Sequence, residues 1–146
     1  MSTVSTYEEL IAEADQEYGQ GRYKDAHIKF GRALSAGSDR NHYCRQMRGM
    51  CSRLVAEDRM EMAIEHPEMR QDYLDQAARW LAKSEANLDS AFDESPAVQL
   101  GHIRLEQART EDAIARFMEM SGGNPARRLS AARTYREEGF DLLANA

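Results

Sequence analysis

The sequence predicts an all-α protein built from antiparallel helical hairpins. Between residues 21 and 34, small and large residues alternate at helical spacing, so that Ala26 and Phe30 share one helix face. The pattern returns 87 residues later at Ala113 and Phe117, and similarity at a fixed offset is typical of repeat architectures. No segment shows the apolar–polar alternation of a half-buried strand.

Composition narrows the class of protein. The chain has 146 residues, which is enough for one domain, residues 1–146, with a sizeable core. The formal net charge of −6 disfavours nucleic-acid binding, which needs a basic surface. No apolar run approaches the roughly 18 residues of a membrane span, and Met1–Thr6 lacks the basic and apolar parts of a signal peptide. We therefore expect a cytoplasmic protein with no membrane insertion.

Residues that could carry chemistry are scattered. Cys44 and Cys51 are seven apart, or about 10.5 Å along a helix, which is too far for an unstrained disulfide. Both are expected to be buried thiols. The four histidines have no metal-ligand spacing, and no nucleophile or phosphate-loop motif is present. The sequence thus predicts no catalytic residue, no metal and no cofactor, and the protein is expected not to be an enzyme.

The first two helices are expected at residues 7–18 and 22–35. Ser5 or Thr6 can cap the first one, because each is followed by a glutamate three residues later. The Gly19–Gly21 segment ends this helix, since glycine adopts left-handed conformations at low cost.

Two unusually long helices are expected next, because no helix breaker occurs between Asp39 and His66. Pro67 is well placed to open the following helix, which continues to about residue 94. A single helix kinked at Pro67 is the alternative. A tight hairpin is favoured because two long amphipathic helices can then bury each other's apolar stripes.

Three further helices complete the predicted total of about seven. Ser95-Pro96 opens one that runs to about Gln107, Thr110 caps another from residue 111 to 120, and Asn124-Pro125 opens the last.

These features resemble the tetratricopeptide repeat family. The resemblance implies a right-handed superhelix of hairpins, with repeats at about 7–38, 40–94 and 95–125 and a capping helix at 126–143. The residues that carry it are Ala14, Gly21, Tyr23, Ala26, Phe30, Ala33 and Leu34 in the first unit, Gly49, Ser84, Leu88, Ala91, Phe92 and Pro96 in the second, and Leu100, Gly101, Ala113, Ile114, Phe117 and Pro125 in the third.

The middle unit departs from the family pattern by its length. Gly49 and Ser84 are 35 residues apart, whereas the corresponding Ala14 and Ala26 are 12 apart. Shared between two helices, the surplus adds roughly 17 Å to each. We therefore expect the central hairpin to project beyond its neighbours.

The resemblance also implies a function, because such proteins bind peptides or protein partners in a groove lined by the first helix of each unit. We expect a non-catalytic adaptor or assembly factor. The groove positions implied for this chain are Asp15, Tyr18, Tyr43, Gln46, Met50, Arg53, Gln99 and His102.

The long hairpin offers a second candidate surface. Trp80, Met62 and Met69 could form an apolar interface there, although packing within the hairpin explains them as well. Two alternatives therefore stay open: a self-assembling module that forms homodimers through this hairpin, and a small chaperone, similar to secretion chaperones, that holds an aggregation-prone client.

Overall fold

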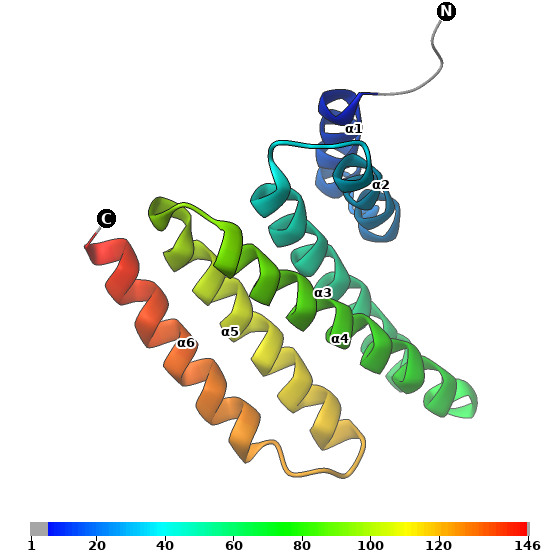
Figure 1. Cartoon of the computed structure of the whole chain (residues 1–146). Coiled ribbons are helices and arrows are strands. Elements are labelled where there is room, and N and C mark those ends of the chain that lie inside the picture. The colour runs from blue at the N-terminus through cyan, green and yellow to red at the C-terminus, as the bar shows by residue number, and fades with distance from the viewer. Residues whose placement is uncertain (1–5, 146) are drawn as a thin grey trace, which may run out of the picture.

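The computed structural model describes residues 6–145 and is all-α, as expected. This part of the chain contains six α-helices and one short 3₁₀ helix. In chain order they are α1 (Tyr7–Gly19), α2 (Tyr23–Ser35), α3 (Asn41–Glu65), η1 (Pro67–Met69), α4 (Arg70–Glu94), α5 (Ala97–Met120) and α6 (Ala126–Ala144). Consecutive helices form three antiparallel hairpins, α1–α2, α3–α4 and α5–α6 (Figure 1). The right-handed superhelical path stays a prediction.

Local signals set most of the helix ends. The Thr6 hydroxyl accepts a hydrogen bond from the Glu9 amide at 3.2 Å, so Thr6 caps α1, while the alternative cap, Ser5, lies outside the described residues. Gly21, at a φ of +77°, makes the turn into α2. Pro67 opens η1 between α3 and α4, so the hairpin is confirmed and the kinked single helix is wrong.

One predicted break is wrong, and it changes the helix count. The helices expected to end at Gln107 and to start after Thr110 are one continuous helix, α5. Thr110 does not cap anything: it is buried, and its hydroxyl lies 2.9 Å from the hydroxyl of Ser84 on α4. The region 95–125 therefore holds one long helix, and α6 pairs with it as the second helix of the last hairpin.

The lengths of α3 and α4, 25 residues each, match the expectation, but the expected projection is only half right. The hairpin extends well beyond α1–α2 (Figure 1). It does not extend alone, because the Arg70 guanidinium at the start of α4 donates to the Met120 carbonyl at the end of α5 at 2.5 Å. The continuous α5 thus runs beside α4 from end to end.

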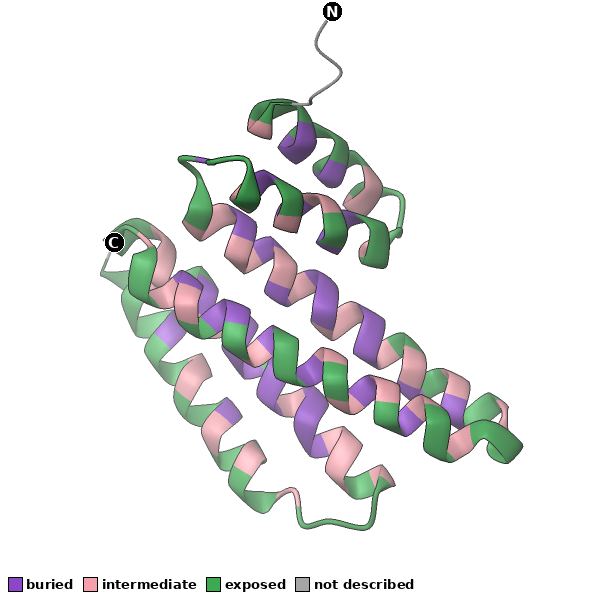
Figure 2. Ribbon diagram, turned by 45° about the vertical axis from the view of Figure 1, so that its right-hand side comes forward, coloured by how far each residue is buried: buried purple, intermediate pink, exposed green. Residues whose placement is uncertain are grey.

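The core follows the facing sides of the helices, where Figure 2 shows the buried residues. Phe30 is fully buried in a cluster shared by α1, α2 and α3, and Met60 in one shared by α3, α4 and α5. Glycines allow the closest approaches: Gly49 lies against Leu88, and Gly101 lies against Gly139. Each of these glycines sits where a side chain would separate two helices.

Candidate functional site

A direct contact between two predicted site residues joins the first helices of the first two hairpins, α1 and α3. The Tyr43 hydroxyl on α3 donates to an Asp15 carboxylate oxygen on α1 at 2.5 Å. Burial and this bond both raise the pKa of Tyr43. On the other side, α3 packs directly against α5. The surface formed by α1, α3 and α5 is called the groove below.

Tyr18 lies on α1 within electrostatic range of Arg53 on α3 and Glu106 on α5. Burial raises the pKa of its phenol, the nearby Glu106 carboxylate raises it further, and the Arg53 guanidinium opposes the shift. Its ring packs edge-on against Tyr23, with the ring centroids 5.5 Å apart. Tyr18 is therefore half-buried beside the charged centre of the groove.

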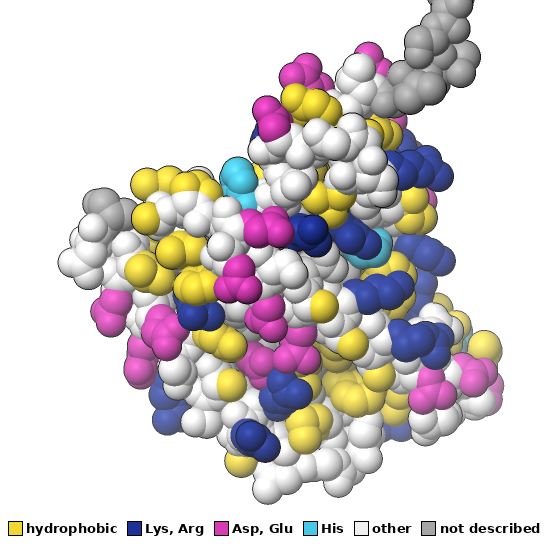
Figure 3. All heavy atoms as spheres, viewed as in Figure 1, with side chains coloured by type: hydrophobic (Ala, Val, Ile, Leu, Met, Phe, Trp, Pro, Cys, Tyr) yellow, Lys and Arg dark blue, Asp and Glu magenta, His cyan; other side chains and the backbone are white. Residues whose placement is uncertain are grey.

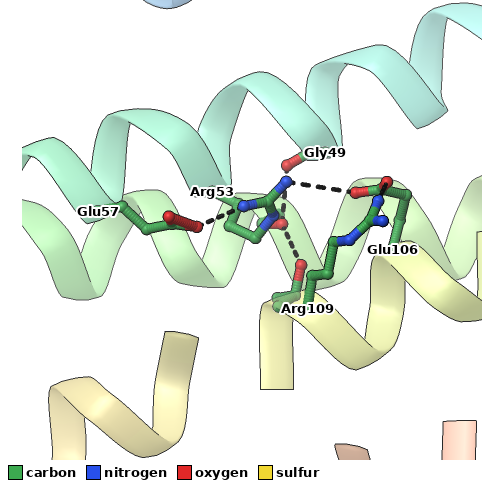
Figure 4. A network of polar contacts seen from close by, with 7 residues as sticks. Gly49, Arg53, Glu57, Glu106 and Arg109 are labelled. Atoms are coloured by element: carbon green, nitrogen blue, oxygen red, sulfur yellow. Dashed lines mark hydrogen bonds and ion pairs between the residues drawn. The ribbon is translucent and has the colours of Figure 1, made fainter. Parts of the chain in front are cut away.

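That centre is Arg53, which Figure 4 shows reaching from α3 between Glu57 of its own helix and Glu106 of α5. Arg53 forms ion pairs with both carboxylates, and the distance to Glu106 Oε2 is 3.4 Å. Arg109 pairs with the same Glu106. The Glu106 side chain is only 6% exposed and that of Arg53 12%. Charges this deeply buried must be paired, so Arg53 holds α3 and α5 together.

A hollow of about 290 Å³ lies beside this network. It is lined by Arg53, Glu57, Arg109, Asp112, Ala113 and Arg116. At its edge Arg116 reaches across from α5 to Glu61 on α3, with a distance of 2.5 Å. The exposed walls therefore carry both signs of charge, on a floor of fixed ion pairs.

Sequence reasoning missed the α5 wall of this hollow. The break expected at residues 108–110 placed Arg109 and Arg116 outside the groove. The signal that could have found them is the spacing of Glu106, Arg109, Ala113 and Arg116, which continues one helix face without interruption.

The remaining predicted groove residues are less closely connected. Gln46 is half-buried on α3, and Met50 packs against the core cluster of α1–α3. On α5, Gln99 is half-buried and His102 is exposed. In the described part of the chain, no side-chain hydrogen bond or ion pair joins Gln99 or His102 to another helix, so the groove contacts concentrate around Arg53.

The predicted hairpin interface divides into two places. Trp80 is half-buried against α2, where its ring meets the His27 ring edge-on at 5.1 Å between centroids. Met62 is half-buried, whereas Met69 is 44% exposed at the hairpin tip, close in sequence to Ile64, which is 53% exposed. Of the three predicted interface residues, Met69 at the tip is thus the one that is exposed to solvent.

His27 is a buried histidine that should make stability depend on pH. Burial lowers its pKa to about 4, and the positive charges of Arg48 and Lys83 contribute. Since the unfolded state takes up the proton near the ordinary value of 6.5, stability falls as the pH drops from there toward 4. We expect a loss of roughly 2 kcal/mol between pH 7 and pH 5 from this group.

Urea unfolding at both pH values measures this loss. The His27→Gln variant should lack the His27 part of it, while His102→Gln, at an exposed position, should behave like the parent protein. Equal pH dependence in the parent and His27→Gln would show that His27 is protonated as readily in the folded state as in the unfolded one.

Cys44 and Cys51 are both buried and not joined by a disulfide. Burial raises the pKa of both thiols, that of Cys51 to about 12, so neither is a reactive thiolate at neutral pH.

Within residues 6–145, no group of three or more His, Cys, Asp or Glu side chains is placed to hold a metal ion. None of the helices in this part of the chain combines the length and apolarity of a membrane span.

Comparison with protein-family profiles, with curated proteins and with solved structures finds no match for this chain.

Proposed function

We propose that the protein is a non-catalytic interaction module, an adaptor or assembly factor of the cytoplasm, that binds a segment of a protein partner in the groove. The observation that carries this proposal is the hollow between α3 and α5, whose floor is a fixed ion network and whose walls expose charges of both signs. Such a surface favours a ligand segment that itself carries both charges, because each then meets its opposite.

The architecture supports a relationship to tetratricopeptide repeats as part of the same proposal. Two observations support it: the chain pairs its helices consecutively into three hairpins, and their first helices meet where Tyr43 of α3 bonds Asp15 of α1 and where α3 packs against α5. Small residues recur at the helix contacts, Ala14, Gly49 and Gly101 among them. The uninterrupted α5 is the main departure from that pattern.

Arg116→Glu and Gln46→Ala test the groove. Both side chains lie on groove helices, and neither belongs to the buried Arg53–Glu106 pair. Affinity capture followed by mass spectrometry identifies partners, and titration with a peptide from a captured partner measures affinity. We expect each variant to lower the affinity for the peptide at least roughly tenfold and to leave the circular dichroism spectrum unchanged.

The matched control is Arg133→Glu, an equal charge change at an exposed site on α6. It should retain the affinity of the parent protein. If instead the groove variants bind as the parent does and Arg133→Glu does not, the partner lies on the last hairpin and the groove proposal fails.

The exposed Ile64 and Met69 favour one alternative, self-association through the hairpin tip. Light scattering at several concentrations would show a mass that rises toward a dimer, and Met69→Asp would abolish the rise. A mass that stays at that of one chain at every concentration excludes this alternative.

A further inference from the structure

We propose that the junction of α2 with the α3–α4 hairpin is a binding site for a phosphate-type oxyanion, formed by Arg48, Lys83 and His27 beside the ring of Trp80. The site is separate from the groove and does not depend on groove binding. Arg48 and Arg53 are five residues apart on α3, which places them about 140° apart around the helix.

The side chains of this site come from three helices that pack together. Arg48 on α3 contacts α2, where a Cβ at Gly31 would lie 3.5 Å from the guanidinium carbon. Lys83 on α4 places its ammonium 4.3 Å from the centroid of the Trp80 ring. His27 on α2 packs against the same ring. Lys83 and His27 thus both contact Trp80, and the charges of Arg48 and Lys83 lie close enough to act on His27.

The charges at this junction are uncompensated. In residues 6–145, neither Arg48 nor Lys83 forms an ion pair with a carboxylate, although most other interior arginines do. Burial and the neighbouring Arg45 lower the pKa of Arg48, and the charges that act on His27 are both positive. Arg45 itself is paired with Glu94 at the edge of the cluster. Figure 3 shows Lys and Arg side chains gathered along this junction.

Two buried polar nitrogens in the cluster lack partners. His27 is 7% exposed, and its Nε2 has no hydrogen-bond partner in the described structure. The Arg48 Nε atom is buried without a partner as well. Unpaired buried polar atoms cost stability, and an oxyanion would satisfy both while neutralising the cations.

The chemistry fits phosphate in particular. A guanidinium offers parallel donors to two oxygens of one anion, an ammonium adds a point charge, and a neutral histidine can donate through the ring nitrogen that carries its proton. Lys83 is exposed, so an anion can approach from solvent without displacing a helix. The anion can be free phosphate or the phosphate monoester of a modified side chain.

Trp80 is the one tryptophan of the chain, so its fluorescence reports binding at this junction. We would titrate the full-length protein with inorganic phosphate and, separately, with O-phosphoserine, against sodium chloride at matched ionic strength. We expect a saturable change with phosphate and a rise in melting temperature, because ligand binding stabilises the folded state. A tighter response to O-phosphoserine would identify a modified side chain as the source, and equal responses would identify free phosphate.

Arg48→Gln and Lys83→Gln should each raise the phosphate concentration at half-saturation at least tenfold. Arg127→Gln, which changes an exposed arginine on α6, should leave that concentration unchanged. Arg48→Gln should also raise the melting temperature without phosphate, since it removes an uncompensated buried charge. Lys83 is on the surface, so its variant tests the site even if Arg48→Gln folds poorly. No saturable change up to tens of millimolar phosphate, or a full response in both variants, would overturn the proposal.

Discussion

Arg53→Glu is expected to lower the free energy of unfolding by about 3–5 kcal/mol, because it replaces the buried cation beside the Glu106 carboxylate with another carboxylate. The Glu106 side chain is 6% exposed and pairs with Arg53 across the α3–α5 contact. A glutamate at residue 53 would add a third carboxylate next to Glu57 and Glu106. Arg109 would remain as a partner of Glu106, but its own side chain is 58% exposed. Urea unfolding followed by circular dichroism measures the loss.

The double variant Arg53→Met/Glu106→Leu separates charge from packing. It removes both charges and keeps apolar volume in their place, so it should recover most of the stability that Arg53→Glu loses. Arg109→Gln is the control at the exposed end of the network and should cost less than about 1 kcal/mol. If Arg53→Glu unfolds at the same urea concentration as the parent, the Arg53–Glu106 pair is accessible to water and does not stabilise the fold.

This expectation changes the role of Arg53. The sequence predicts Arg53 as one of the partner-binding positions of the groove. The structure puts it under the groove, holding two of its walls together. A loss of binding in Arg53→Glu could therefore result from unfolding as readily as from a lost contact, which is why Arg116, whose side chain is 39% exposed, is the better test.

Sequence reasoning succeeds for the helices and hairpins because their signals are local. Gly21, Pro67 and Gly122 interrupt the chain between helices, and the structure turns at each of them. The apolar periodicity between these breaks predicts which faces are buried. The helix cap predicted at Thr110 is wrong, although a hydroxyl residue followed by an acidic one has the pattern of a helix cap. Its actual partner, Ser84, is 26 residues away on α4, and no local pattern reveals such a contact.

The candidate sites divide in the same way. Asp15, Tyr43 and Arg53 could be assigned to one surface because the resemblance to the repeat family aligns the first helices of successive units. Their bonds to one another could not, because those depend on how far α1, α3 and α5 are offset. The junction of Arg48, Lys83 and His27 is entirely non-local, since each residue belongs to a different helix.

Gly139→Val is expected to lower the free energy of unfolding by about 2–3 kcal/mol, through overpacking of α5 against α6. A Cβ at this position would lie 2.9 Å from Leu105 Cδ2 and 3.0 Å from the Gly101 carbonyl oxygen. The leucine could rotate, but the carbonyl belongs to the backbone of α5 and could move only with the helix. The contact is reciprocal, because a Cβ at Gly101 would lie 3.0 Å from the Gly139 carbonyl.

The loss of stability in Gly139→Val should be largest in α6, since α6 is the final helix and packs mainly on α5. Hydrogen exchange should therefore quicken in α6 before it does in α3 and α4. Gly31→Ala is the matched control: its new Cβ would meet only the Arg48 side chain at 3.5 Å, an ordinary contact. That variant should gain about 0.5–1 kcal/mol from the better helix propensity of alanine. If Gly139→Val had the same free energy of unfolding as Gly31→Ala, the backbones of α5 and α6 would not be in contact at Gly101 and Gly139. The last hairpin would then not be the close pair on which the position of the α5 wall of the groove depends.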